Sequence, residues 1–167
     1  NDASSYYIIF NFKTPLLQNL KVRQALSAAF DRQAALDTVY KCNIVALGFL
    51  PPGLYCGDKE FRKEVPEEPT KALLSEVKDP KALFIEGLKE LKMNPDPSKA
   101  KLKLLMGQAT SLSTAYAQFI QNQFETKIGC KIEIEHAVDS PAYFQARTKG
   151  EFDLCAGGWG ADFNDVS

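Results

Sequence analysis

The sequence is poor in histidine and has no closely spaced cysteines. His136 is its single histidine, and none of its four cysteines belongs to a Cys-x-x-Cys pair. Protein zinc sites are built from such ligands, commonly grouped in close pairs, so we expect neither a metal nor another cofactor. The sequence also lacks a Gly-x-Ser-x-Gly elbow and a phosphate-binding glycine loop ahead of a helix. These shortages weigh against an enzyme.

Long apolar runs and charge of one sign are missing as well. No stretch approaches the roughly 20 apolar residues of a membrane-spanning helix, and residues 1–5 lack a signal-peptide pattern, which is uninformative if the chain is an excised piece. Lys and Arg number 20 against 21 Asp and Glu, and neither sign forms a block. We therefore expect no nucleic-acid partner. The densest charge, in residues 58–71, mixes both signs and is typical of a solvated loop.

The four cysteines fall into two groups by their surroundings. Cys42 and Cys56 flank a loop rich in proline and glycine. A disulfide between them is compatible with an oxidising compartment, and two free thiols are equally compatible with the sequence. Cys130 and Cys155 lie in apolar strand patterns, where a free cysteine usually serves as a small buried hydrophobic residue.

The first part of the chain predicts a strand followed by a long helix. With 167 residues, 45% of them hydrophobic, the chain is long enough for a single α/β core. Residues 6–12 are aromatic and β-branched and end at a Lys-Thr-Pro turn, as a strand does. Asn19 offers a cap for a helix, and apolar residues at three- and four-residue spacing over 22–40 predict about five helical turns.

A loop and a second helix follow. Periodicity is lost over residues 43–69, where Pro51-Pro52-Gly53 marks a turn. Loops of this length in compact domains are usually functional or disordered, and the apolar content of residues 44–55 favours a function. Asp79 and Pro80 then begin a helix with a cap and a proline at its first position.

The second part of the chain alternates strands and helices. Two strands with a helix after each, and a final strand, imply two right-handed crossovers and a parallel core. We therefore expect a mostly parallel sheet flanked by helices. The expected elements are, in order, a strand at 101–106, a helix at 113–128 closed by Gly129, a strand at 131–135, a helix at 140–148 and a strand at 152–156.

Residues 157–165 follow the last expected strand and carry the candidate site. Ligands of open α/β sheets collect beyond the carboxyl ends of the strands, so a loop here is well placed for binding. Its glycines allow either a close backbone approach or a positive φ. Trp159 supplies a flat apolar wall, and Asp162 a carboxylate for a cation or an ammonium group. The same residues are also compatible with a glycine turn, a core tryptophan and a solvated aspartate.

Three segments together resemble one known family. Residues 10–16 and 19–32 are similar to its asparagine-containing strand, proline turn and Val-Arg-Gln-Ala-Leu helix that ends in an acid and an arginine. Residues 48–53 resemble its Pro-Pro-Gly loop, and residues 152–165 its Gly-Trp-x-Ala-Asp-Tyr-x-Asp-Pro motif. By these segments the chain resembles family 5 of the bacterial extracellular solute-binding proteins, the oligopeptide, dipeptide and nickel class of ABC importers.

The chain departs from this family at two positions of the last motif. Phe163 stands where a tyrosine is common, which removes a hydroxyl group near the site. Val166 stands where the motif usually carries proline, so the exit from the loop is less rigid.

The resemblance implies a fold and a function. The fold is a periplasmic-binding-protein-like lobe, with residues 1–167 forming a single α/β lobe, the second of a two-lobed protein and an excised, truncated piece of it. The two lobes close over a ligand by hinge motion. The function is capture of peptides in the interlobe cleft, outside the cytoplasm, for delivery to ABC permease subunits. The protein would be periplasmic or a lipoprotein of the cell surface. The same fold also binds nickel complexes, sugars or signalling peptides, or serves as a sensory lobe.

The resemblance also assigns roles to individual residues. Asp162 matches the carboxylate that pairs with a peptide α-ammonium group, and Trp159 lines the cleft. Gly158 and Gly160 let main-chain groups reach the ligand. Arginines on the first helix could suggest further contacts with a ligand, but for Arg23 and Arg32 we expect ion pairs and solvated helix ends.

Overall fold

The protein is built around a four-stranded mixed sheet. The computed structural model describes residues 4–41, 43–66 and 69–162. Three strands are parallel and one edge strand is antiparallel, which confirms the expected mostly parallel sheet. In spatial order the strands are β1 (Ser4–Phe10), β6 (Leu154–Gly160), β4 (Lys101–Met106) and β5 (Lys131–His136).

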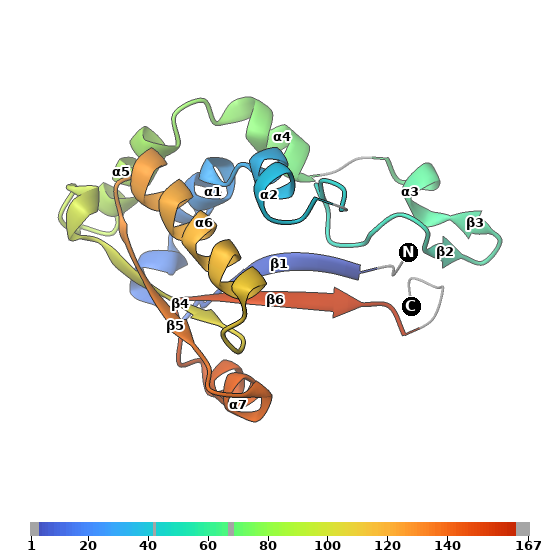
Figure 1. Cartoon of the computed structure of the whole chain (residues 1–167). Helices are drawn as coiled ribbons and strands as arrows, with labels where there is room; N and C mark the ends of the chain where they lie inside the picture. Colours follow the sequence, from blue (N-terminus) through green and yellow to red (C-terminus); the bar gives the residue numbers. More distant parts are fainter. Residues whose placement is uncertain (1–3, 42, 67–68, 163–167) are drawn as a thin grey trace.

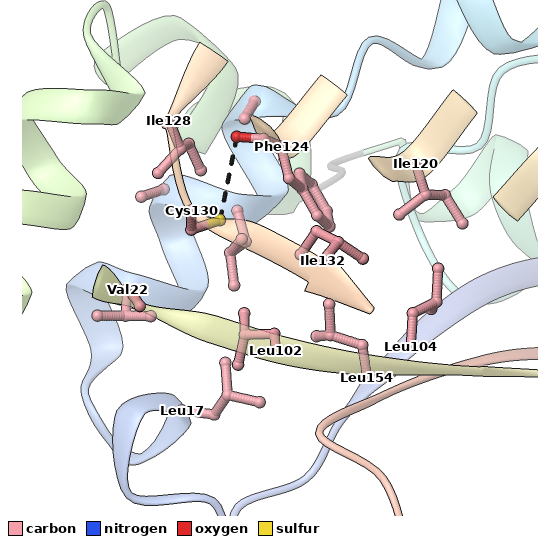
Figure 2. Packing of buried hydrophobic residues seen from close by; sticks show 14 of the residues in the cluster. Leu17, Val22, Leu102, Leu104, Ile120, Phe124, Ile128, Cys130, Ile132 and Leu154 are labelled. Atoms are coloured by element: carbon pink, nitrogen blue, oxygen red, sulfur yellow. Dashed lines mark hydrogen bonds between the residues drawn. The ribbon is translucent and has the colours of Figure 1, made fainter. Parts of the chain in front are cut away.

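Helices cover the two faces of the sheet unequally. The helices that pack on the core lie on one face, and α7 (Ser140–Lys149) lies on the other (Figure 1). Figure 2 shows the core on the first face, where strand residues such as Leu102 and Leu154 meet Phe124 and Ile128 of the helical layer. Full burial of such a side chain contributes about 1.5–3 kcal/mol. The helices of this layer are α1 (Leu20–Ala29), α5 (Pro80–Glu90) and α6 (Ser111–Lys127).

The long first helix that the spacing predicts is in fact two helices. α1 begins after Asn19, whose side chain accepts from the Val22 amide at 3.2 Å, as expected. It ends at Ala29, because Asp31 takes an extended conformation and caps α2 (Arg32–Thr38) through the Ala34 amide at 3.0 Å. Asp31, which the family pattern places at the end of a helix, therefore caps the beginning of the next helix.

The two arginines of this region bind main-chain carbonyls rather than carboxylates. Arg23 donates to the carbonyls of Leu17 and Gln18 at 2.8 and 2.9 Å, in the 3-10 helix η1 (Pro15–Gln18). Arg32 donates to the Ser27 carbonyl at 3.1 Å, in the last turn of α1. Among the described residues neither arginine forms the expected ion pair, and each guanidinium group donates instead to carbonyls that the end of a helix leaves without a partner.

The segment predicted as one long loop contains short elements. Their lengths are too small for a periodic pattern, which explains why the sequence does not reveal them. Cys56 lies in one of two short paired strands and is exposed. Cys42 lies outside the described residues, so the disulfide between Cys42 and Cys56 remains a prediction. The elements are β2 (Tyr55–Cys56), β3 (Lys59–Glu60) and α3 (Phe61–Glu64), and α4 (Pro69–Glu76) begins at the last residue of the segment.

The strands and helices of the second part largely match their predicted ranges. Gly129 closes α6 with a φ of 96°, and the 3-10 helix η2 (Pro97–Lys99) precedes β4. Cys130 and Cys155 are buried free thiols, as expected. No helix of the described residues is both long and apolar enough to cross a bilayer.

The last strand differs most from its prediction. It was expected at 152–156, but β6 runs to Gly160, because β1 pairs with it along its whole length. Gly158, Trp159 and Gly160 therefore belong to a strand and not to the predicted loop.

Candidate functional site

The carboxyl half of β6 extends beyond the parallel part of the sheet (Figure 1). β4 pairs with β6 only as far as Leu105, opposite Cys155, whereas β1 pairs with β6 as far as Gly160. Residues 156–160 therefore have β1 along one edge and, within the described part of the chain, no strand along the other. An open edge of this kind presents main-chain N–H and C=O groups to any extended chain that docks there.

Strand alternation decides which groups the open edge presents. The Asn11 amide donates to the Asp153 carbonyl across the β1–β6 pair at 2.9 Å. In an antiparallel pair, successive residues point their main-chain groups alternately toward and away from the partner strand. The main-chain groups of Ala156, Gly158 and Gly160 consequently point away from β1, along the open edge.

Trp159 forms an aromatic wall beside this edge. Its ring lies 5.5 Å from that of Phe49, with the planes tilted by 37°. The Tyr7 ring also contacts Phe49, with a centroid distance of 5.3 Å. Ser5, which is opposite Trp159 on β1, is buried and donates its hydroxyl to the Phe49 carbonyl at 2.6 Å. The loop thus crosses the outer edge of β1 and brings Phe49, which remains 53% exposed, onto the tryptophan.

The glycines of β6 make room for tyrosine rings. A Cβ atom on Gly157 would lie 3.1 Å from the Tyr7 ring, and one on Gly158 would lie 3.2 Å from the Tyr6 ring. Their strand conformation excludes the positive φ that the sequence left open. The close approach that these glycines permit is therefore made by β1 tyrosines, and a small residue also leaves the main chain of β6 accessible.

Asp162 lies two residues beyond the end of β6 and is exposed. Trp159 is partly exposed, so neither side chain belongs to the hydrophobic interior. The structure brings Gly158, Trp159 and Gly160 onto one strand and Asp162 to its carboxyl end. Phe163 and Val166 lie outside the described residues.

A polar group on α7 borders the other end of the open edge. The Tyr143 hydroxyl donates to the Ala156 carbonyl at 2.6 Å, and the Cys155 thiol lies 3.4 Å from the same hydroxyl. Burial, with the Cys155 contact, raises the pKa of Tyr143 to about 12, so its hydroxyl is protonated at neutral pH. Burial lowers the pKa of Arg147, but the nearby hydroxyls of Tyr7 and Tyr143 raise it on balance.

A cavity of about 740 Å³ lies on the other side of β1, between this strand and residues 43–52. Tyr6 stacks on Tyr40 at 5.9 Å, and Tyr40 meets Tyr116 edge to face at 5.1 Å. Burial raises the pKa of Tyr40 and of Tyr116. The cavity is lined by aromatic and aliphatic side chains together, and it adjoins the aromatic wall, because Tyr7 and Phe49 line it as well.

Several residues of the site escape sequence reasoning. Phe49 lies in the Pro-Pro-Gly segment, which the sequence indicates as a loop, but nothing in the sequence indicates a role for its aromatic ring. In the sequence, Tyr7 is one of several aromatic residues of the first strand, and no pattern distinguishes it from the others. Nothing in the sequence indicates a role for Tyr143, because its hydrogen bond to Ala156 depends on the position of α7 against the sheet.

Comparison with known proteins identifies similar chains over the full length. The model of a family described as "Bacterial extracellular solute-binding proteins, family 5 Middle" matches residues 1–167. The oligopeptide-binding protein OppA of Bacillus subtilis is 24% identical over 98% of this chain and 28% of its own length. The di/tripeptide-binding protein 1 of Pseudomonas aeruginosa is 31% identical over 95% of this chain and 27% of its length. The chain thus spans about a quarter of the curated relatives that it matches.

A solved structure shares the fold. OppA of Listeria monocytogenes, bound to peptide, superposes with a TM-score of 0.82 and 26% identity, over 99% of this chain and 32% of that one. The likeness includes the mixed sheet with helices on both faces, as the sequence predicted.

Proposed function

Because this chain belongs to family 5 of the bacterial extracellular solute-binding proteins, matched over residues 1–167, we propose that it captures peptides for an ABC importer. The relatives reported above are named as oligopeptide-binding and di/tripeptide-binding proteins. The structure of OppA from Listeria monocytogenes holds a peptide. Peptide is therefore the ligand class that the relatives favour.

One observation carries the proposal: the open edge of β6 lies beside the aromatic wall. A peptide that adds a strand along Gly158 and Gly160 gains main-chain hydrogen bonds that do not depend on its side chains. Trp159 and Phe49 offer apolar area to whichever side chains face them. This combination suits a ligand of variable sequence, which is what a nutrient-peptide receptor must accept.

Asp162 is the proposed anchor for the peptide α-ammonium group. It is exposed in this structure and lies just past the carboxyl end of the open edge, where a terminus of a docked strand would lie. A hydrogen bond between a carboxylate and an ammonium group that is shielded from water contributes about 1.5–3 kcal/mol. Such a contact would fix one end of the peptide without reading its sequence.

We also propose that the ligand is held between this lobe and a second lobe. The matched relatives are more than three times as long as the aligned region, which covers 28% of the Bacillus subtilis protein. In this arrangement the chain forms one α/β lobe, and the second wall of the cleft comes from the rest of the protein. Closure of two lobes around a ligand is a hinge motion, and β1 would begin near the hinge.

The family is described as extracellular, and we propose that the protein works in the periplasm or on the cell surface as a lipoprotein. Its partners are then the peptide and the membrane permease subunits. It carries out no chemical conversion in this role. A hydrolysis screen on peptides that bind would contradict this last point by detecting turnover.

Native mass spectrometry identifies the ligand class directly. The complete protein, purified without refolding, should carry a distribution of small masses that match peptides. A single mass that matches a nickel complex or a sugar would instead favour another solute on the same fold.

The anchor role is tested by Asp162→Ala in the complete protein. We expect the variant to bind trialanine more than about tenfold more weakly in calorimetry, since one charge-assisted contact is lost. Glu76→Ala is the matched control, because it removes an exposed carboxylate from the end of α4. Equal affinities of Asp162→Ala and wild type would contradict the anchor.

A further inference from the structure

The open edge of β6 begins at a carbonyl that is already occupied. Pairing between β4 and β6 ends at Leu105 and Cys155, so the next outward carbonyl, that of Ala156, has no ladder partner on β4. The Tyr143 hydroxyl takes this position at 2.6 Å. A side chain of α7 thus replaces the main-chain donor that a longer β4 would supply.

The next outward carbonyl along the edge, that of Gly158, has a weaker hydrogen-bond contact than that of Ala156. The Tyr7 hydroxyl reaches the Gly158 carbonyl at 3.4 Å. This is long for an O–H···O hydrogen bond, whose usual range ends near about 3.0 Å. Gly158 is also exposed, whereas Ala156 is partly buried. A docking peptide amide could therefore displace the contact at Gly158 far more easily than the one at Ala156.

Tyr143 is held firmly enough to act as a fixed donor. Its ring packs against Phe144 with centroids 5.2 Å apart, and its oxygen contacts the Cys155 sulfur at 3.4 Å. Displacing it would leave the Ala156 carbonyl and the tyrosine hydroxyl without partners in a partly buried place, which costs free energy.

We propose that Tyr143 is a stop that ends the peptide-binding edge of β6 at Ala156. This inference rests on the proposed peptide-binding function and adds a residue that sets peptide register and length. The main chain of a docked peptide pairs with Gly158 and Gly160 only. Residues of a longer peptide that extend past Gly158 leave the strand path and gain no main-chain bond to β6.

The test compares trialanine and pentaalanine on the complete protein by calorimetry. In the wild type the two peptides should differ little in Kd. Tyr143→Ala frees the Ala156 carbonyl and opens the path, so pentaalanine should bind about fivefold more tightly relative to trialanine, as expected for one added hydrogen bond. Tyr143→Phe keeps the ring contact with Phe144, and its ratio should move in the same direction.

Two controls separate this inference from the proposed function. Tyr55→Phe removes an exposed tyrosine hydroxyl on β2 and should leave the ratio of the two Kd values unchanged. If Tyr143→Phe binds trialanine like wild type and the ratio stays at the wild-type value, the stop is refuted while peptide binding stands. If wild-type protein binds neither peptide, the proposed function fails, and the stop fails with it.

Discussion

Asp153 and Asn11 illustrate how residues that resemble a family motif serve the fold rather than the ligand. The Asp153 carboxylate accepts from the Thr14 hydroxyl at 2.6 Å and from the Lys103 amide at 2.8 Å. The Asn11 side chain donates to the Phe152 carbonyl at 2.7 Å. Together they tie the turn after β1 to the amino ends of β4 and β6. This clamp lies at the opposite end of β6 from Trp159, so its role is to fix the register of the ribbon that presents the open edge.

Removing the carboxylate of the clamp should lower stability. Asp153→Ala leaves the Lys103 amide and the Thr14 hydroxyl without their partner, and hydrogen bonds to a charged group are worth about 1.5–3 kcal/mol each. We expect the free energy of unfolding to fall by about 3 kcal/mol or more in urea titrations. Glu151→Ala, at an exposed position two residues earlier, should change it by less than about 0.5 kcal/mol. Equal stability of the two variants would show that the clamp does not hold the strands.

At the scale of elements, α1 and α5 are packed closely enough to require glycine. A Cβ atom on Gly87 of α5 would lie 2.6 Å from Cγ2 of Val22 and 2.8 Å from Oδ1 of Asn19. The second contact falls on the capping side chain of α1, and the Val22 amide nitrogen is only 3.1 Å away. Since part of the obstacle is main chain, the helices would have to move apart.

Gly87→Ala should therefore destabilise the protein despite the better helix propensity of alanine. Overpacking costs about 1–3 kcal/mol, and the propensity gain of about 1 kcal/mol offsets part of it. We expect a net loss of up to about 2 kcal/mol, measured as a lower urea midpoint with an unchanged m-value. Gly107→Ala is the matched control, because no atom lies within 4 Å of its added Cβ. A Gly87→Ala midpoint at or above the wild-type value would contradict the close packing.

The helices and strands also show which parts of the fold can be predicted from the sequence. The alternation in the second part of the chain predicted β4, α6, β5 and α7 within a few residues, because each has a full periodic pattern and a local cap or glycine end. The break at Asp31 was missed because its capping bond competes with a helix-period pattern that continues on both sides. The strand beyond Ala156 was missed because glycine favours loops locally, and only pairing with β1 makes these residues extended.

The candidate site shows the same limit. Trp159 and Asp162 are candidates from the sequence because an unusual residue type follows a parallel strand, which is a signal that sequence carries, and their binding role stays a prediction. Phe49 and Tyr143 were not, because each reaches β6 from a segment far away in the sequence. Side chains that act through tertiary contacts have no local pattern, so only the fold reveals them.

At the scale of the whole molecule, the two ends of the sheet differ in how completely they are closed. The Asp153 clamp connects the amino ends of β4 and β6 to the turn after β1. The carboxyl end carries the open edge of β6 together with exposed apolar side chains on the segments around it, including Phe49, Phe144 and Val138 at 53%, 58% and 79% exposure. Exposed apolar area gathered at a binding edge usually marks a surface that meets a partner. This asymmetry supports the proposal that ligand is captured at the carboxyl end of the sheet.

The chain on its own should fold yet bind peptide poorly. Its core is continuous from η1 through β6, so residues 1–167 contain the contacts that a cooperative unit needs. A peptide on the open edge, however, would be covered by β6 and the aromatic wall on one side only, and would leave its other edge in water. We expect trialanine to bind the isolated chain about a hundredfold more weakly than the complete protein in calorimetry, because affinity depends on burial and pairing from both sides. A cooperative urea transition of the isolated chain is the control for folding. If the folded chain alone matched the affinity of the complete protein, the open edge would suffice and the second lobe would have no share in holding the ligand.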